Sequence, residues 1–377
     1  MTHHKINLSM IKAASTLFEK GELENCLLIG VQHCLYTTFK MMEALFDKGL
    51  AAENILLLGK CYSTDPSVFQ MMREKKIDIS EDSLKFDSHI AYDDYFDQKI
   101  KEFLQSKLQK IMSKNYRKII ILDDGGALIR KFQTFSCSLK NVIAIEQTSS
   151  GYNDLLHANH QIPIINVARS KAKHIFEPKQ INLQAIENIQ KAILHLNRPD
   201  PKKILVLGNG SIGSALKSLL ENKYQVDLYD IQASKNRLAI HNLNKLLPDY
   251  DMILGCSGKC SIGHKQHHLL KKDCILASIS SSDREFDAVY LRRTKPRQTM
   301  NCFNDIYSHR VFLLNSGFPM TFVGKNAEIL NYSHFTRALL MCAIKQSLKE
   351  HKKSGFIQLD ETLQNNMLNV FKNLESS

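Results

Sequence analysis

The sequence predicts an α/β protein with two domains, each built around a parallel sheet. Short apolar runs alternate with helical patterns through the first half of the chain, and a second series of this kind follows residue 200. Between the two series lies the clearest break in the chain, Asn197-Arg-Pro-Asp-Pro201. A chain of 377 residues is long enough for two domains that each bury a core.

The first half contains five apolar runs that we interpret as strands, at residues 26–31, 55–58, 118–122, 141–145 and 162–167. A helical pattern at 37–46 separates the first two. Asp124 follows the third strand, at the carboxyl end where such sheets present ligands. Burial would raise the pKa of its carboxyl group and suit it to general-base catalysis. The alternative is that Asp124 only caps the following helix.

The second half begins with a helical stretch, 183–196, which leads into the break. Beyond the break, residues 335–349 form a long amphipathic pattern, and 371–377 is a polar end that we expect to fray. The apolar runs expected to form strands in this half are 204–207, 252–256, 274–279 and 311–315.

A glycine-rich turn follows the strand at 204–207. Gly208 allows a tight bend, Gly210 lets the backbone approach a pyrophosphate, and Gly213 lets the next helix close on the strand. The free N–H groups of that helix would face the phosphates. Asp230 ends the next strand and is placed to accept hydrogen bonds from ribose hydroxyls, which favours NAD over NADP. This complete unit predicts a doubly wound, Rossmann-type NAD domain; the alternative is a glycine turn in a cofactor-free α/β domain. The residues expected to contact the cofactor here are Gly208, Asn209, Gly210, Ser211, Ile212, Gly213, Asp230 and Ser257.

Composition indicates an ordinary globular protein, with 44% hydrophobic and 23% charged residues. There is no apolar run of about 18 residues and no signal-peptide pattern in the amphipathic segment 1–20, so we expect a cytoplasmic protein with no membrane partner. The formal net charge of +12 is spread along the chain without a basic stripe interleaved with aromatic residues. We therefore expect no nucleic-acid partner, although the charge can attract an anionic small molecule.

The nine cysteines are scattered through apolar runs, which favours reduced thiols over a disulfide framework. One cluster, Cys256-x3-Cys260-x3-His264 followed by His267 and His268, contains residue types that bind zinc. Structural zinc sites usually have more closely spaced cysteine pairs, and this cluster spans a strand end and a helix start. We therefore assign no metal, and leave open whether this cluster binds one.

The motifs resemble those of the S-adenosylhomocysteine hydrolase family, in the same order, from about His33 to about Glu361. The family has DDGGD, EETTTG, PAINVNDSxTKxxFDN and GYGxxGKG. The matching segments here are Asp123-Asp124-Gly125-Gly126, Glu146-Gln147-Thr148-Ser149-Ser150-Gly151, Pro163-Ile-Ile-Asn166-Val167 with Lys171-Ala-Lys173, and the glycine turn. The resemblance implies a diverged family member. In the family, tightly bound NAD oxidises a ribose 3′-carbon, the 4′-proton is removed, a 5′-thiol is eliminated, water adds, and the hydride returns.

The resemblance also implies roles for individual residues. By motif position, Lys173 is the lysine beside the 3′-hydroxyl, Asp124 the aspartate near the 4′-proton, and His33 the histidine near the leaving group. Without the family match, His33 and Lys173 would be ordinary surface or core residues. Three hydroxyl residues are expected to help at the nicotinamide end of NAD: Thr148, Ser149 and Ser150.

Several positions depart from the family's pattern. Gln147 replaces a glutamate that holds the ribose hydroxyls, so a neutral amide replaces a charged acceptor. Phe176-Glu177-Pro178 stands at the family's FDN, Ser281 at the histidine of NIGHFD, residues 324–328 at GHPSF, and Leu35 at a threonine. Gln147 and Glu177 remain the expected substrate contacts. The family's lysine- and tyrosine-containing tail is missing, which argues against NAD sharing between the chains of an oligomer.

These features predict four segments along the chain. Residues 1–182 would form a substrate-binding α/β domain, 183–200 a hinge helix and linker, 201–334 the NAD domain, and 335–377 a helix that returns to the first domain and a short tail. We expect a homo-oligomer, specifically a dimer, without exchange of that tail.

Three functions fit the sequence. The first is a redox-elimination enzyme that keeps NAD, His33, Asp124 and Lys173 but acts on a changed nucleoside- or sugar-like substrate. The second is a catalytically weak NAD-binding or regulatory homologue, and the third is an ordinary S-adenosylhomocysteine hydrolase. The retained trio favours the first, because a binding module has no need of a lysine and a carboxylate at the ribose.

Overall fold

The computed structural model describes residues 8–135, 140–231, 242–300, 303–323, 331–350 and 354–375. The chain forms two compact units, and each contains a doubly wound sheet, as the sequence predicts. Unit 1 consists of Met1–Leu84, Asp97–Phe176 and Glu328–Ser377. Unit 2 consists of Lys85–Phe96 and Glu177–Ala327.

The division between the units differs from the predicted segments. The boundary falls after Phe176 rather than after residue 182, and Lys85–Phe96 belongs to unit 2 although it was predicted in the first domain. Arg292 shows the physical reason, because its guanidinium donates to the backbone oxygens of Ser88 at 2.9 Å and Ile90 at 3.3 Å. The first of these contacts joins residues 204 positions apart, which no local sequence pattern reveals.

Unit 1 contains a seven-stranded sheet in the order β13-β6-β5-β4-β1-β2-β3, and every neighbouring pair is parallel. The near-continuous apolar runs predict this, since a parallel sheet is buried on both faces. β1 and β5 are buried along their whole length. The strands are β1 Cys26–Gln32, β2 Ile55–Gly59, β3 Asp78–Ile79, β4 Lys118–Asp123, β5 Val142–Glu146, β6 Pro163–Asn166 and β13 Gly355–Gln358.

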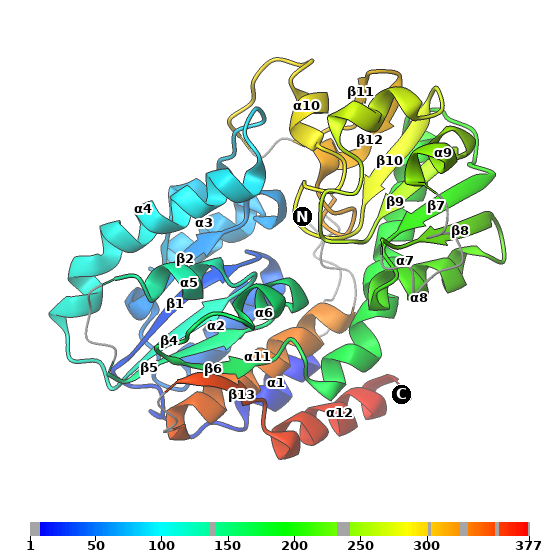
Figure 1. Cartoon of the computed structure of the whole chain (residues 1–377). Helices are drawn as coiled ribbons and strands as arrows, with labels where there is room; N and C mark the ends of the chain where they lie inside the picture. Colours follow the sequence, from blue (N-terminus) through cyan, green and yellow to red (C-terminus); the bar gives the residue numbers. More distant parts are fainter. Residues whose placement is uncertain are drawn as a thin grey trace. The chain divides into compact units, whose positions relative to one another are not determined.

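Helices cover both faces of this sheet. α4, α5 and α6 lie on one face, and α11 packs with α1, α2 and α12 on the other (Figure 1). The chain leaves β1 towards β2 on one side and later returns to β4 on the other side, so the strand order reverses between β1 and β4. The helices that lie wholly or partly in unit 1 are α1 Ser9–Ser15, α2 Tyr36–Phe46, α3 Pro66–Glu74, α4 Tyr92–Ser113, α5 Ala127–Phe132, α6 Ser149–Leu155, α7 Lys171–His195, α11 Asn331–Lys349 and α12 Glu361–Glu375.

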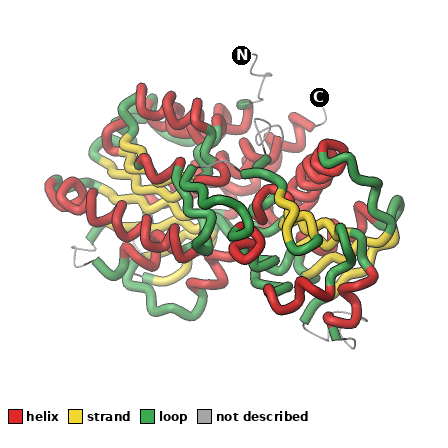
Figure 2. The backbone as a smooth tube through the Cα atoms, turned by 90° about the horizontal axis from the view of Figure 1, so that it is seen from above, coloured by secondary structure: helices red, strands yellow, loops and turns green. Residues whose placement is uncertain are grey.

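Unit 2 contains a six-stranded sheet in the order β11-β12-β10-β9-β7-β8, parallel except for the β11–β12 pair. Alternate residues of β7 enter different cores: Ile204 and Val206 pack on one face, Leu205 and Leu207 on the other. In Figure 2 the strands of each sheet lie among helices. The remaining elements are β7 Lys203–Leu207, β8 Gln225–Tyr229, β9 Met252–Gly255, β10 Cys274–Ser278, β11 Ile306–Ser308, β12 Val311–Leu313, α8 Ser211–Leu220, α9 Leu243–Leu246 and α10 Ala288–Arg292.

Three predicted elements need correction. The helix predicted at 183–196 begins earlier, at Lys171, as the single helix α7. The strand predicted at 311–315 ends at Leu313, because Asn315 has a φ of 48° and cannot continue a strand. The expected fraying of 371–377 is wrong for its first five residues, since α12 continues to Glu375. Phe371, which is 2% exposed, anchors the end of that helix.

Candidate functional site

The glycine turn of unit 2 has the geometry that its sequence predicts. Gly208 has a φ of +106°, and a Cβ there would lie 2.8 Å from the backbone of Cys256. A Cβ on Gly213 would lie 1.9 Å from the carbonyl oxygen of Gly208, so the start of α8 closes tightly on the turn. Gly210 has nothing within 4 Å of its Cβ position, so the turn is open on this side. The backbone is therefore accessible where a pyrophosphate would approach.

The acid and the serine predicted for this site flank the turn. Asp230 follows β8, and its Oδ2 accepts the backbone N–H of Asn209 at 2.8 Å. Ser257 follows β9, and its hydroxyl donates to Glu285 at 2.8 Å. β7 and β9 are neighbours at the point where the strand order of unit 2 reverses. Nucleotides bind at such reversal points in α/β sheets.

A second group of polar side chains lies in unit 1, also where the strand order reverses. His33 follows β1 and Asp124 follows β4, and these strands are neighbours. The His33 Nε2 lies 3.2 Å from an Asp124 oxygen. The Gln147 amide also donates to Asp124, and the Lys173 ammonium donates to the backbone oxygen of Gln147. The structure thus brings together four of the predicted residues, at the sheet edge where ligands bind.

Lys60 is a member of this group that sequence reasoning missed. It directly follows β2, is 6% exposed, and its ammonium pairs with the Asp124 carboxylate. Its position just after a predicted strand is the signal that could have identified it, as it identified Asp124. We refer to His33, Lys60, Asp124, Gln147 and Lys173 as the polar cluster.

Asp124 is a carboxylate, and the expectation of a raised pKa is wrong. Burial by itself would raise the pKa of Asp124, but the neighbouring His33 and Lys60, through their charges and hydrogen bonds, hold it well below its usual range. The expectation failed because it considered burial without a cation beside the acid. The alternative role as a helix cap is wrong too: the backbone N–H of Ile129 in α5 donates to Asp123, at 2.8 Å.

His33 is neutral in this arrangement. Burial lowers its pKa, and the opposing effect of Asp124 does not fully compensate. Since an ionised carboxylate only accepts hydrogen bonds, the ring proton is on Nε2, which faces Asp124. The unprotonated Nδ1 then accepts the hydroxyl of Ser63, whose oxygen lies 2.5 Å away. Ser63 and His33 form a path along which a proton can move.

Two further carboxyl groups, Asp123 and Glu146, lie beneath the polar cluster, paired in register on β4 and β5. Both are fully buried. Burial raises the pKa of Asp123 to about 7 and that of Glu146 well above its usual value, and Asp123 adds to the shift of Glu146. Glu146 accepts the backbone N–H of Thr148 at 2.7 Å, so it fixes the loop that carries Gln147.

The other predicted cofactor residues of unit 1 are Thr148, Ser149 and Ser150. The Thr148 hydroxyl donates to Glu146 at 2.6 Å and accepts the N–H of Gly151 at 3.0 Å, so it caps α6. Ser149 and Ser150 are exposed. Glu177, the second predicted substrate contact, lies on α7 in unit 2 and is half-buried.

No group of three histidine, cysteine or acidic side chains among the described residues is arranged to hold a metal ion. Within the Cys256–Cys260–His264 cluster, the His264 Nδ1 lies 2.8 Å from Asp287. Cys137 and Cys302 lie outside the described residues, as do the positions 324–328 that correspond to the family's GHPSF. In the part of the chain that the structure describes, no helix is long and apolar enough to span a membrane.

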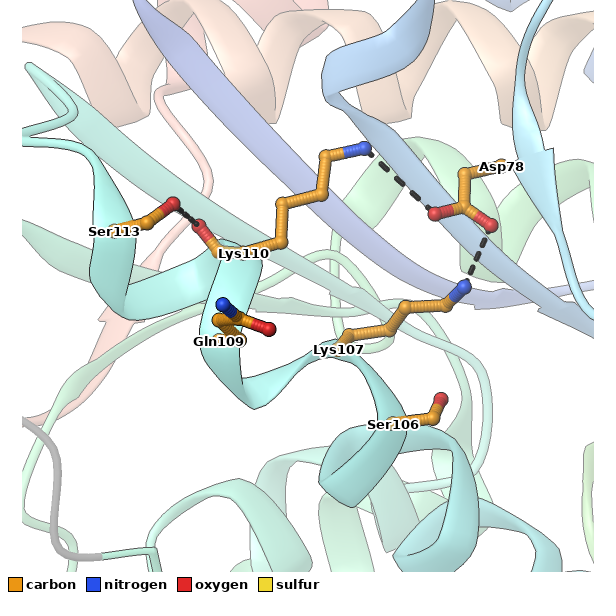
Figure 3. A pocket seen from close by; sticks show the side chains of 6 residues that line it. All are labelled: Asp78, Ser106, Lys107, Gln109, Lys110 and Ser113. Carbon is orange, nitrogen blue, oxygen red and sulfur yellow. Dashed lines mark hydrogen bonds and ion pairs between the residues drawn. The ribbon is translucent and has the colours of Figure 1, made fainter.

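A surface hollow of about 360 Å³ lies away from the polar cluster, at the start of β3 (Figure 3). Lys107 and Lys110 of α4 both approach Asp78 here, at 2.7 Å and 3.7 Å. Because β3 begins at Asp78, the hollow lies towards the amino ends of the strands. Its charged groups are thus paired with one another.

Comparison with known proteins gives no match to any family model. The chain is 35% identical, over 329 residues, to uncharacterised proteins of two Mycobacterium tuberculosis strains, CDC 1551 / Oshkosh and ATCC 25618 / H37Rv. The match covers 85% of this chain and 64% of each relative.

Solved structures with a related chain course include apo D-lactate dehydrogenase from Escherichia coli, with a TM-score of 0.41, 11% identity, and coverage of 87% of this chain and 99% of that one. NAD⁺-bound 3-phosphoglycerate dehydrogenase from Entamoeba histolytica has a TM-score of 0.42, 10% identity and coverage of 88% and 100%. A dipicolinate synthase component from Bacillus halodurans has 0.44, 12%, and 88% and 100%. The chain therefore has substantial sequence similarity to uncharacterised mycobacterial proteins, of whose length it spans 64%.

Proposed function

We propose that this protein is a NAD-dependent enzyme that oxidises an alcohol carbon of a nucleoside- or sugar-like substrate and uses that oxidation to allow an elimination at the neighbouring carbon. The observation that carries the proposal is the buried polar cluster at the strand-order reversal of unit 1. A cofactor-binding module alone would have no use for five buried polar side chains there, three of them able to carry charge within one connected set of contacts.

The glycine turn of unit 2 fits a dinucleotide. The Cβ positions show why each glycine is needed, and the open side at Gly210 leaves room for phosphate oxygens beside the start of α8. Asp230, at the end of β8, would hold the adenosine ribose hydroxyls of NAD. When bound, NAD accepts a hydride from an alcohol carbon and can later return it.

The polar cluster divides the acid–base work among its members. Asp124 is a weak base because its pKa is low, so its function would be to orient His33 and to stabilise the imidazolium that forms when His33 takes a proton. Neutral His33 accepts that proton at Nδ1, either through Ser63 or directly if the hydroxyl moves aside. Lys173 would assist removal of the alcohol proton.

The proposed roles make activity depend on pH in one direction. Because the pKa of His33 is lowered, its neutral form persists to a pH below the ordinary histidine value of about 6.5. We expect kcat to be constant through neutral pH and to fall only in more acidic solution. A His33→Gln variant should lose this acidic limb of the profile together with most of its activity.

The decisive experiment measures NAD affinity by calorimetry in Gly210→Val and Asp230→Ala. Gly210→Val places a side chain where the turn is open, so the protein should fold normally and lose NAD binding. Gly263→Val is a matched control, because its Cβ position is also open and it lies outside the turn. Unchanged NAD affinity in both test variants would refute the cofactor assignment.

The chemistry is tested by following reduced nicotinamide absorbance during turnover of a panel of nucleosides and sugar-like alcohols. Lys173→Ala should prevent reduction of the cofactor, whereas His33→Gln should allow reduction but slow the elimination. Turnover of a substrate with no reduced cofactor at any stage would contradict the redox mechanism. Release of adenosine and homocysteine from S-adenosylhomocysteine at roughly 1 s⁻¹ or faster would instead favour the ordinary hydrolase.

A further inference from the structure

The first turns of α11 lie at the same sheet edge as the polar cluster. One Nη1 atom of Arg337 is 3.4 Å from the side-chain oxygen of Gln32, the last residue of β1. Further along the helix, Lys345 pairs at 2.5 Å with Glu22, which precedes β1. α11 therefore runs antiparallel to β1, and its amino-terminal turns lie near the end of the strand that His33 follows.

His334 is one helical turn before Arg337 and is 2% exposed. Neither of its ring nitrogens has a hydrogen-bond partner among the residues that the structure describes. Burial alone lowers the pKa of His334 to about 4, so the ring is neutral, with one N–H to donate. Each buried polar atom left without a partner typically costs about 1–3 kcal/mol. A phenylalanine would fill the same space without this cost, so a ligand that pairs with the ring is the simplest reason for a histidine here.

Arg337 is 4% exposed, and its charge reaches the residues at the end of β1. It contributes to the lowered pKa of His33 and partly offsets the effect of burial on the pKa of Cys34. A guanidinium is a planar fork of donors that matches the paired oxygens of a carboxylate or a phosphate. Residues i and i+3 of a helix are neighbours on its surface.

We propose that Arg337 and His334 form a binding site for an oxyanion, a carboxylate or phosphate group, at the edge of the unit 1 sheet that carries the polar cluster. The guanidinium supplies the charge and the fork of donors, and the imidazole N–H supplies a further hydrogen bond. The inference rests on the proposed function only in taking this oxyanion as part of the substrate, which would make that substrate anionic. The net charge of +12 favours the approach of such a ligand.

Calorimetric titration with inorganic phosphate and, separately, acetate tests the site and distinguishes the two kinds of oxyanion. We expect saturable binding of at least one of them with a 1:1 stoichiometry. Arg337→Met should weaken it at least tenfold. Arg337→Lys should restore only part of it, because the charge returns without the fork. Arg73→Met is the control, since Arg73 is exposed and forms an ion pair with Glu81 on the surface of unit 1.

His334→Phe provides a second variant whose fold is not at risk. It should melt at the same or a higher temperature than the native protein, because it removes two unpaired buried atoms, and yet bind the oxyanion at least tenfold more weakly. A histidine that is merely structural would show the first effect without the second.

Absence of saturable phosphate and acetate binding up to about 10 mM, which is tenfold above a Kd of about 1 mM, would overturn the proposal. So would native affinity in both Arg337→Met and His334→Phe. These results are independent of the NAD titration: loss of the oxyanion site leaves NAD affinity unchanged, and failure of the cofactor assignment leaves phosphate binding unchanged.

Discussion

Asp124 shows how one neighbour can reverse the chemistry of a residue. A buried aspartate alone would favour its protonated form, but Lys60 next to it keeps the carboxylate ionised. The sequence motif identified the position of Asp124 and gave no sign of this partner, because Lys60 is 64 residues earlier and reaches Asp124 only through the pairing of β1 with both β2 and β4. Proximity across a sheet decided the charge.

Lys60→Gln should destabilise the protein, since it leaves a buried carboxylate without its cation. Breaking such a pair typically costs about 3–5 kcal/mol. Lys75→Gln is a matched control, because Lys75 pairs with Glu43 at 3.5 Å on the surface, where a pair contributes about 0–1 kcal/mol. Chemical denaturation at pH 7 measures both. Equal stability of Lys60→Gln and the native protein would mean that Asp124 is not held ionised by Lys60.

Asp123 should make stability depend on pH in the opposite sense to Asp124. Its folded-state pKa is about 7, above the unfolded value of 3.8, so its contribution is fully present below pH 4 and is lost as the pH rises through 7. Asp123→Asn mimics the protonated acid and should remove this loss. We therefore expect Asp123→Asn to gain stability relative to the native protein on going from pH 5 to pH 8, at about 1.4 kcal/mol for each unit of pKa difference at most. A constant difference between the two proteins across that range would contradict a raised pKa.

At the scale of elements, the glycine turn and α8 were predictable because each glycine has a local reason that is visible in the sequence. Other elements were not, because their reasons are distant. α12 was expected to fray from its polar composition, yet Phe371 packs against Phe176 and Phe335 with ring centroids 4.9 Å and 4.8 Å away. The two partners come from α7 and α11, and no pattern within α12 identifies them.

Gly213→Ala should separate tight packing from ligand access. The added Cβ would lie 1.9 Å from the Gly208 carbonyl oxygen, so α8 must shift away from the turn. We expect a loss of about 1–3 kcal/mol in the free energy of unfolding, as for other overpacked sites. Gly210→Ala, with open space at its Cβ, should keep native stability. Denaturant melts of the two variants test this, and equal stabilities would show that the turn does not restrain α8.

Phe371→Ala should destabilise unit 1, because it removes a side chain that is 2% exposed from a cluster of three rings. Such truncations typically cost about 3–5 kcal/mol. Leu374, which is only half-buried on the same helix, is the comparison site, and Leu374→Ala should cost less. If Phe371→Ala melts like the native protein, the end of α12 contributes nothing to the core of unit 1.

At the scale of the whole molecule, the sequence predicted two α/β units and the polar residues at their strand ends, since parallel sheets impose both the apolar runs and the place where loops gather. It did not predict which segments belong to which unit. Asp87, for example, pairs with Arg297 through a contact 210 positions apart. The candidate site was similarly only half visible: His33, Asp124 and Lys173 followed from motifs, whereas Lys60, Ser63, His334 and Arg337 emerged only from their contacts.

The interleaving of the two units has a consequence for biosynthesis, where the chain emerges from the ribosome amino end first. Unit 1 takes β13 and α11 from Glu328–Ser377, so its sheet and the helix at its centre are complete only after those last residues have been made. Unit 2 needs nothing beyond Ala327 and has its early segment, Lys85–Phe96, already made. Unit 2 can therefore mature while unit 1 still exposes apolar strands to solvent. Nascent chains stalled near residue 330 should accordingly engage chaperones through their first 176 residues.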